Sequence, residues 1–453
     1  RPTHPCGPRG QQPCKANIMG STLTRTTPGP RPTHPRRGAL RALALATLLA
    51  FAPVTFADTP LPGADVASVR TWLLGNNPDL QAMQAEAEAA QARIYPAGAL
   101  PDPMVGISLQ GINPDRPNLL PGNVGSATYS VKQPIPLWGK RGLARDVARQ
   151  QADAIQLERE AAALRLLAQA EQAYVRYWHA REGVAVVDRL IELLAQMEEV
   201  ARVRYALGVA AQQDSIRAQV ARTAMQRERI ERLAIREEAV AMLNATLGRP
   251  ADAPLAEPTG EPVLAVPAAS LGEALGLLAE ARHPALRAST ALAGAADTAA
   301  QLQRRRRLPD LTLGVGVMQR DDRVDAYEVM LEVEIPLQRR ALREREREAL
   351  LMRDAATARA EAIGTELQGQ LGQAWAQTRS AREQRRLIEQ TLLPQAQANF
   401  ESALASYRVG DVDFGTLLEA LEAWQGADLS RVDVRRNELV GAATVRALIG
   451  SVE

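Results

Sequence analysis

The sequence of 453 residues predicts a mainly α-helical, elongated fold made of two tandem copies of one unit, each with a pair of short β-strands. Three observations predict it. The composition is 46% hydrophobic but only 4% aromatic, and Ala, Leu, Arg, Glu and Gln dominate, which is typical of long helices. Runs of about 40 residues lack both Gly and Pro. Five short motifs also recur in the same order about 200 residues apart.

Residues 1–57 are predicted to be a leader that contains a secretory signal peptide. The segment holds eight Lys or Arg residues, no acidic residue and both cysteines of the chain. An arginine-rich stretch precedes the uncharged, mostly apolar residues 42–56, and small residues end the segment, so cleavage is expected after Ala57. We expect residues 1–18 to lie upstream of the true start at Met19.

The remainder of the chain carries 46 basic and 52 acidic residues, a formal charge of −6. This charge gives no indication of nucleic-acid binding.

A membrane anchor is the alternative interpretation of the apolar stretch in the leader. That stretch is short for a span of ~20 residues and contains Pro53, so the signal peptide is favoured and export is expected.

The recurring motifs define an internal duplication. They pair Asn77–Leu80 with His283–Leu286, Leu100–Asp102 with Leu308–Asp310, Ile135–Leu137 with Ile335–Leu337, Tyr205–Gly208 with Tyr407–Gly410, and Leu247–Gly248 with Ile449–Gly450. Their offsets lie between 200 and 208 residues. The Pro- and Gly-rich stretch 248–268 is predicted to be a linker between the copies. The first repeat is therefore 58–247 and the second is 269–453.

Each copy reads as helix, strand, strand, long helix and helix. In the first copy one helix is predicted from about 140 to 206, followed by a turn at Gly208 and a second helix over 209–247. The second copy repeats this order with a helix over about 338–408, a turn at Gly410 and a returning helix. At ~1.5 Å per residue such a helix is roughly 100 Å long, so the helices must pack side by side as a bundle or tube.

Four short segments alternate apolar and polar residues in the manner of β-strands: 105–110, 126–132, 311–317 and 327–335. About ten residues with a period of two is the pattern of a transmembrane strand. A soluble hairpin packed on a helix would alternate equally well, but export and duplication favour membrane strands. Four strands cannot close a membrane barrel, and open strand edges do not occur in lipid, so several copies must share one barrel.

The polar face of these strands carries charges. Glu328, Glu332 and Glu334 share one face of the last segment, and Lys132 lies in the second. With the apolar face toward lipid, these four residues are predicted to line the barrel lumen at a formal charge of −2 per chain. Rings of carboxylates favour cations, so the sequence predicts a cation-selective pore.

The duplicated order, the paired strands and the two Tyr-x-x-Gly turns resemble the TolC-type outer-membrane efflux proteins over about residues 70–450. Pro101–Pro103 and Gln133–Arg141 look most similar to the branch that serves heavy-metal resistance pumps of the cobalt-zinc-cadmium and copper-silver type. The resemblance implies a homotrimer in the outer membrane of a Gram-negative bacterium. It also implies a 12-stranded β-barrel with four strands from each chain, and an α-helical tunnel in the periplasm.

The resemblance further implies a passive export duct that works with a periplasmic adaptor (membrane fusion) protein and an inner-membrane, proton-driven pump of the RND type. In this family the interhelical turns form the periplasmic tip that meets the adaptor. The residues that match are Tyr205, Gly208, Tyr407 and Gly410. A periplasmic coiled-coil scaffold or adaptor without a pore is the alternative function.

The gate of the multidrug members is only partly matched. Those members close the tip with a Tyr–Arg–Asp network and with acidic residues along the second helix of the hairpin. Tyr407 matches the Tyr, but Val412 occupies the Arg position, and the acidic positions align with Thr416 and Glu419. Three acidic residues near this turn are expected to form rings at the entrance when three copies meet: Asp411, Asp413 and Glu419.

An enzyme is not expected, and neither is a cofactor or a resident metal. After the leader the chain has no cysteine, two histidines, and no HExxH, GxSxG or phosphate-loop motif. We expect His179 to pack or to face solvent, and Arg304–Arg307 to form a solvated face or an anchor near the strands. Without a Cys or His cluster the chain cannot select a metal by tight ligation, so substrate selectivity belongs to its partners.

Overall fold

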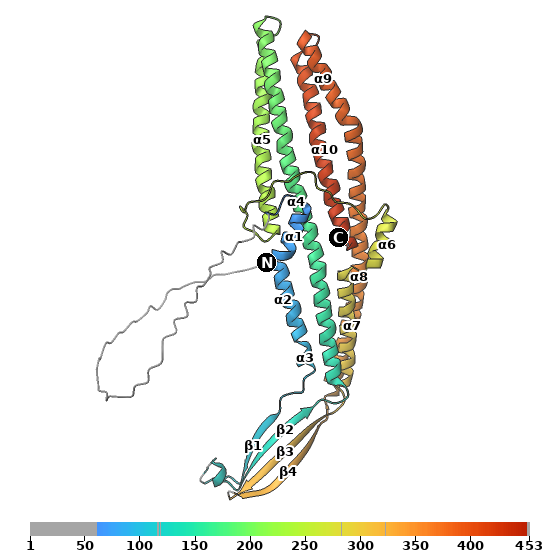
Figure 1. The fold of residues 1–453 in the computed structure, drawn as a ribbon. Coiled ribbons are helices and arrows are strands. Elements are labelled where there is room, and N and C mark those ends of the chain that lie inside the picture. Colours follow the sequence, from blue (N-terminus) through green and yellow to red (C-terminus); the bar gives the residue numbers. More distant parts are fainter. Residues whose placement is uncertain (1–60, 116, 118, 282, 322, 451–453) are drawn as a thin grey trace, which may run out of the picture. The chain divides into compact units, whose positions relative to one another are not determined.

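The computed structural model describes residues 61–450 except 116, 118, 282 and 322. The predicted signal peptide and start site lie outside these residues. In the described unit, long helices run side by side, the strands lie at one end, and the two interhelical turns lie at the other (Figure 1). None of the helices within these residues is both long and apolar enough to cross a membrane.

The first repeat follows the predicted order, except that its leading helix is divided. Its elements are α1 (Val66–Asn76), α2 (Pro78–Ala92), the short α3 (Ile94–Ala97), β1 (Met104–Gln110), the 3₁₀ turn η1 (Pro121–Asn123), β2 (Ser126–Ile135), α4 (Lys140–Ala206) and α5 (Gln212–Thr246). Asn77 ends α1 and caps α2, because its Oδ1 accepts the N–H groups of Asp79 and Leu80 at 2.9 and 3.2 Å. Pro78 takes the first helical position, where no N–H is needed.

The second repeat is built in the same way. It contains α6 (Leu271–Ala281), α7 (Pro284–Arg305), β3 (Asp310–Arg320), β4 (Arg323–Glu334), α8 (Arg339–Leu387), the π-helical segment η2 (Ile388–Leu392), α9 (Leu393–Val409) and α10 (Phe414–Ile449). His283 caps α7 as Asn77 caps α2: its Nδ1 accepts the N–H of Ala285 at 3.2 Å, and Pro284 follows. The single leading helix predicted for each copy is therefore divided, into α1, α2 and the short α3 in the first repeat and into α6 and α7 in the second.

The long helix of the first repeat is confirmed. It was predicted over 140–206, and α4 spans Lys140–Ala206 without a break. Its half near the turns packs into one apolar core with the other hairpin, where Leu194, Met197, Phe400 and Leu417 are all buried. Burial along one face holds a helix of this length, because intrinsic propensity alone contributes little.

The long helix of the second repeat was predicted as one run over 338–408, and this prediction is wrong. The run divides into α8, the π-helical η2 and α9, and the ribbon changes direction there (Figure 1). Pro394 lies just after η2; it cannot donate to the carbonyl of Gln390, and its ring would collide with that carbonyl in a regular helix. The repeat offset also rises from 200 to 202 along this run, and the wider π turn accommodates extra residues.

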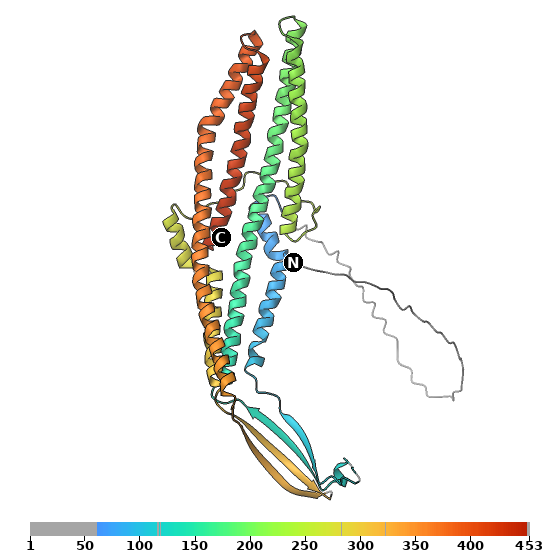
Figure 2. The same ribbon diagram turned by 180° about the vertical axis from the view of Figure 1, so that it is seen from behind.

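The helices near the strands form a layer in the order α2, α4, α7, α8. Adjacent members of this series are in contact, and α4 lies between α2 and α7 in both views (Figures 1 and 2). The sheet is antiparallel and has the matching order β1-β2-β3-β4. The predicted strands are confirmed, each a few residues longer than expected or shifted at its ends. β1 and β4 are the edge strands of this sheet.

The junction between sheet and helices is made by the segment Gln133–Arg141. Lys140 Nζ, at the start of α4, lies 2.8 Å from Asp310 Oδ2 and donates to the carbonyl of Leu308 at 2.7 Å. The N–H of Leu137 donates to Asp310 Oδ1 at 2.9 Å, and the indole of Trp138 donates to the Pro309 carbonyl at 2.7 Å. Residues of the first repeat thus hold the start of β3 in the second repeat.

Helices α8 and α10 approach each other closely at Gly441. A Cβ built there would lie 2.2 Å from Oγ1 and 3.2 Å from Cβ of Thr378, which is buried and bonded through Oγ1 to the carbonyl of Ala374 at 2.7 Å. Glycine is therefore required at this contact by space and not by backbone conformation.

We expect Gly441→Ala to destabilise the protein by about 1–3 kcal/mol, because the added methyl group forces α8 and α10 apart. Thermal unfolding of the detergent-solubilised protein measures this effect. Gly426→Ala is the matched control in α10, since no heavy atom lies within 4 Å of its added Cβ. That change should leave stability unchanged or raise it by up to ~1 kcal/mol through helix propensity. Equal melting temperatures for the two variants would contradict the close contact.

Candidate functional site

The sheet has one apolar and one polar face, as predicted. On the apolar face, Tyr327, Val329 and Leu331 of β4 are 82%, 86% and 66% exposed. Val105, Ile107, Val131 and Val315 on the neighbouring strands are exposed on the same face. An apolar surface of this extent on a two-sided sheet is a binding or membrane surface and not a solvated one.

The polar face brings two of the predicted lumen residues together. Lys132 of β2 pairs with Glu332 of β4 across the intervening strand. Gly314 of β3 lies opposite both Lys132 and Met330, and a Cβ at this position would lie 3.1 Å from Lys132 Cγ. The glycine therefore leaves room for the lysine to cross. Glu328 and Glu334 lie on the same face and have no ion-pair partner among the described residues.

The two interhelical turns have the same geometry. Gly208 and Gly410 adopt φ values of 72° and 96°, as expected for glycines that reverse a helix. In one turn the N–H of Val209 donates to the Arg204 carbonyl at 3.0 Å, and in the other the N–H of Asp411 donates to Ser406 at 2.9 Å. These are equivalent bonds in the two repeats.

The tyrosines of the two turns differ in their surroundings. Tyr205 is 47% exposed, whereas Tyr407 is 1% exposed and its hydroxyl donates to Asp214 Oδ2 at 3.0 Å. Burial and the bond to Asp214 raise the pKa of Tyr407 to about 12. The Arg204 guanidinium stacks on the Tyr407 ring, 4.6 Å from its centroid. The side chains of two repeats therefore meet in a Tyr–Asp–Arg contact between the hairpins.

This contact contains the residue types that the family gate uses, but its Arg does not come from position 412. Arg204 of α4 takes that place beside Tyr407, while Val412 packs against the apolar core of the hairpins. The sequence reasoning missed Arg204 and Asp214. The available signal was that both lie within a few residues of the first Tyr-x-x-Gly turn.

The predicted acidic residues lie on the exposed side of the second turn. Asp411, Asp413, Thr416 and Glu419 are all exposed. Asp413 caps α10 by accepting the N–H of Thr416 at 2.7 Å, and hydrogen bonds from Thr416 lower the pKa of Asp413. A cap of this kind holds the start of α10 in place and keeps the carboxylate ionised.

His179 does not form an open ligand site. It is buried, and its Nε2 lies 2.7 Å from Asp433 Oδ1. Within residues 61–450, apart from the four gaps, no group of His, Cys, Asp and Glu could hold a metal ion. Arg304 and Arg307, from the predicted arginine run, both pair with Glu346 of α8, so part of this run ties α7 to α8 near the strands.

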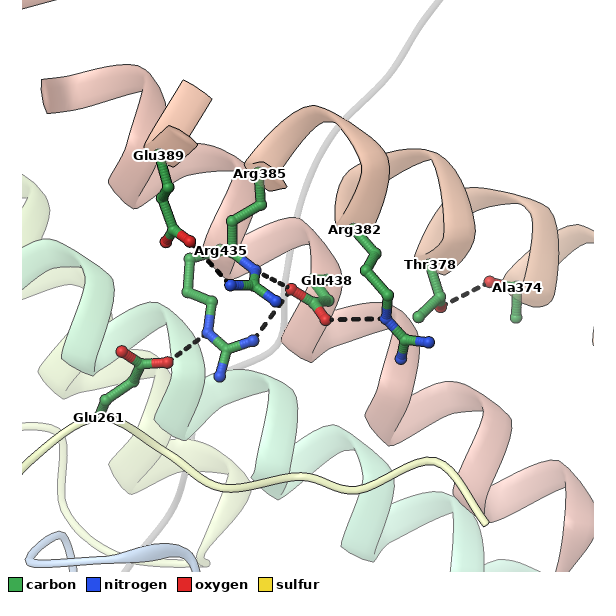
Figure 3. Close-up of polar contacts among 8 residues, drawn as sticks. All are labelled: Glu261, Ala374, Thr378, Arg382, Arg385, Glu389, Arg435 and Glu438. Carbon is green, nitrogen blue, oxygen red and sulfur yellow. Dashed lines mark hydrogen bonds and ion pairs between the residues drawn. The ribbon is translucent and has the colours of Figure 1, made fainter. Parts of the chain in front are cut away.

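A buried ion network at mid-length was not predicted. Glu438 of α10 is 6% exposed and accepts hydrogen bonds from Arg382, Arg385 and Arg435 at 3.2, 2.7 and 2.9 Å (Figure 3). Burial alone would raise the pKa of Glu438, but the three hydrogen bonds outweigh it and lower the pKa below its ordinary value.

The network extends to two neighbouring segments. Arg385 also bonds Glu389 of the π-helical η2 at 2.8 Å, and Arg435 pairs with Glu261 of the 248–268 stretch (Figure 3). One carboxylate therefore links α8, the start of the π turn, α10 and the segment between the repeats. This arrangement ties the residues at the start of the π turn to α10.

We expect Glu438→Gln to lower stability by about 3–5 kcal/mol, because it leaves three clustered guanidinium groups without a buried counter-charge. Thermal unfolding at pH 7 measures the loss. Glu383→Gln is the control, since its pair with Arg379 is largely exposed and is worth at most ~1 kcal/mol. A lowered folded-state pKa gives stability that is present above the ordinary carboxylate pKa and is lost as pH falls. Acid should therefore destabilise the wild type more than the variant; parallel pH profiles would contradict this role.

The comparisons with known proteins agree with this geometry. The family model described as "Outer membrane efflux protein" matches residues 71–249 and 275–451, one match for each repeat. The outer-membrane channel OprN is similar over 85% of this chain and 89% of its own, with 18% identity and a TM-score of 0.73. CusC matches with 16% identity over 86% and 93% and a TM-score of 0.73.

The outer membrane protein VceC from Vibrio cholerae matches with 18% identity, a TM-score of 0.72, and coverage of 86% of this chain and 97% of its own. No curated protein matches the sequence. At these identities the solved structures show the fold, a mainly helical chain with a four-stranded sheet, while the family model covers most of the sequence. The expectations of an outer-membrane location and of a protein that is not an enzyme are confirmed, because the chain belongs to the outer membrane efflux protein family.

Proposed function

We propose that the chain is the outer-membrane channel of a tripartite, RND-type efflux system and acts as a passive duct across the periplasm and the outer membrane. One observation carries the proposal. A four-stranded sheet with an exposed apolar face and a charged opposite face continues into helices that are long enough to span much of a periplasm. A protein that stayed in solution would not expose Tyr327, Val329 and Leu331 in this way.

In this proposal three chains assemble into one 12-stranded barrel and one helical tunnel. Open edges on β1 and β4 require neighbouring strands in lipid, which a second chain supplies. Tyr205, Gly208, Tyr407 and Gly410 form the periplasmic tip that meets the adaptor protein, and the pump is reached through that adaptor. The scaffold without a pore remains the alternative, and it gives the exposed apolar face of the sheet no role.

The proposed substrates are heavy-metal cations. This rests on the two short segments that resemble the heavy-metal branch, on the likeness to CusC among other channels, and on the unpaired carboxylates of Glu328 and Glu334 on the polar face. Asp411, Asp413 and Glu419 would add acidic rings at the entrance, since all three are exposed beside the turn. Such rings attract cations without binding them tightly.

The expected conductance is cation-selective in planar bilayers. Glu328→Gln, Glu332→Gln and Glu334→Gln together should reduce that selectivity, because they remove the carboxylates that line the proposed lumen. Glu383→Gln, on an exposed helix surface, is the control and should leave selectivity unchanged. Anion selectivity in the wild type, or an unchanged triple variant, would show that this face is not the lumen. Recovery as a soluble periplasmic monomer would rule out the channel itself.

The contact of Tyr407 with Asp214 is proposed to hold the tip closed. Tyr407→Phe removes the hydroxyl but keeps the ring under Arg204, so we expect a larger open fraction and a higher single-channel conductance at pH 7. The raised pKa of about 12 keeps the hydroxyl protonated, and the contact present, up to about pH 10. Tyr205→Phe is the matched control in the other repeat, because that side chain is half exposed. Equal conductance of both variants would exclude this role.

A further inference from the structure

In a single chain, the sheet ends in an edge strand on each side, and the helix layer ends in an outer helix on each side. In the sheet, β1 and β4 each have a neighbour on one side only. In the helix layer, α2 and α8 are the outer members, beside β1 and β4 respectively. One flank therefore belongs to the first repeat and the opposite flank to the second.

In the strands, each residue of the first repeat corresponds to one residue of the second repeat at a constant offset. The leading strands are offset by 208, as Asp102 and Asp310 show, and the second strands by 200, as Ile135 and Ile335 show. Applied to the pair Val105↔Val131 of the first hairpin, these offsets give positions 313 and 331, and Leu313↔Leu331 is the pair observed in the second hairpin. The two hairpins are thus equivalent in register.

The chain also shows how the repeats join each other. β2 of the first repeat pairs with β3 of the second, with Val131 opposite Val315 and Lys132 opposite Gly314. The same two offsets, with the repeats exchanged, give the pairing of β4 with a β1 that follows it. In a single chain, β1 and β4 are at opposite edges of the sheet, so that strand must come from another copy.

We propose that β4 pairs with β1 of a second copy of this chain at one defined register, with Leu331 opposite the partner's Ile107 and Met330 opposite the partner's Ser108. This proposal rests on the assembly of several chains under the proposed function and specifies the contact that builds it. The register keeps the two faces in phase. Leu331 and Ile107, 66% and 62% exposed in the single chain, meet on the apolar face.

The same relation supplies an ion pair between subunits at the sheet–helix junction. Lys140 and Asp310, which bind each other 2.8 Å apart within the chain, correspond to Arg340 and Asp102. Both are exposed and have no ion-pair partner in the part of the chain that the structure describes. Arg340 therefore pairs with the partner's Asp102, a second joint of the type that Lys140 makes within the chain.

Burial in the helix layer points to the same interface. Ala152 of α4 is 1% exposed, whereas the corresponding residue of α8, Met352, is 55% exposed. α4 has neighbours on both sides in the layer, while α8 has α7 on one side only. A partner's α2, placed as α7 is placed on α4, would cover Met352.

Engineered disulfides test the register. The chain has no cysteine after residue 57, so any disulfide formed in this part must join two introduced cysteines. Ser108→Cys with Met330→Cys should cross-link rapidly into covalent dimers and trimers on a non-reducing gel. A link within one chain is excluded, because strands at opposite edges of a four-stranded sheet lie about 14 Å apart at ~4.8 Å per step.

The register controls are Ser108→Cys combined with Glu328→Cys or with Glu332→Cys. Both alternatives lie on the same face but two residues away, where diagonal Cβ atoms are ~7–8 Å apart and exceed disulfide reach. Faster cross-linking by either control pair would overturn the register. An outer-membrane channel that conducts normally but cross-links with none of the three pairs would overturn the inference alone, whereas the absence of any membrane oligomer would overturn the proposed function.

Charge reversal tests the junction. Asp102→Arg and Arg340→Asp should each lower the temperature at which the oligomer dissociates on a denaturing gel, and the double variant should restore most of it. Arg339→Asp is the matched control, because its counterpart in the first repeat is Gly139, which has no side chain. Loss in both single variants without recovery in the double variant, or an equal loss in Arg339→Asp, would overturn the pair.

Discussion

The N–H and C=O groups along the outer sides of β1 and β4 have no neighbouring strand in the described part of one chain, although the sheet between them carries an apolar face suited to lipid. Hydrocarbon cannot hydrogen-bond these groups, so a sheet of four strands is stable in a membrane only as part of a closed ring. Duplication of one unit satisfies this constraint with a single type of contact. The join between the two repeats inside the chain has the same form as the join that must be made between chains, and the long helices that follow each hairpin extend the ring into a tube.

The two repeats are not interchangeable at the opposite end. Tyr205 is exposed, whereas Tyr407 is buried against Arg204 and bonds Asp214. The second long helix also departs from the first, since Pro394 and the extra residues produce the π turn that the Glu438 network ties to α10. Near the strands the repeats obey one register, and near the turns they differ. A closed barrel requires equivalent strands, whereas the proposed gating contact involves Tyr407 alone of the two turn tyrosines.

Most of the fold was predicted from the periodic spacing of apolar residues. The strands alternate cleanly because one face is apolar throughout, and the bounds of α4 agree with the prediction because Gly139 precedes this helix and Gly208 follows it. The break at 388–392 was not predicted because the apolar pattern continues across it; Pro394 is its signal in the sequence. Contacts between residues distant in sequence, such as Asp214 with Tyr407 or Glu438 with Arg382, have no periodic signal. The sequence places these residues on helices but does not say which helix they face.

The pairing of Lys132 with Glu332 decides which residues carry the predicted net charge of the lumen. In the proposed register Glu332 lies opposite the partner's Gly106, as Lys132 lies opposite Gly314 in the chain. On its other side Glu332 lies opposite Thr312 of β3 and pairs with Lys132 of β2, so in the proposed barrel this level carries a ring of alternating and compensating charges. The net charge of −2 per chain is then carried by Glu328 and Glu334, on either side of that ring. Unpaired carboxylates at two levels suit a duct. They attract cations without holding them tightly, so that ions can both enter and leave.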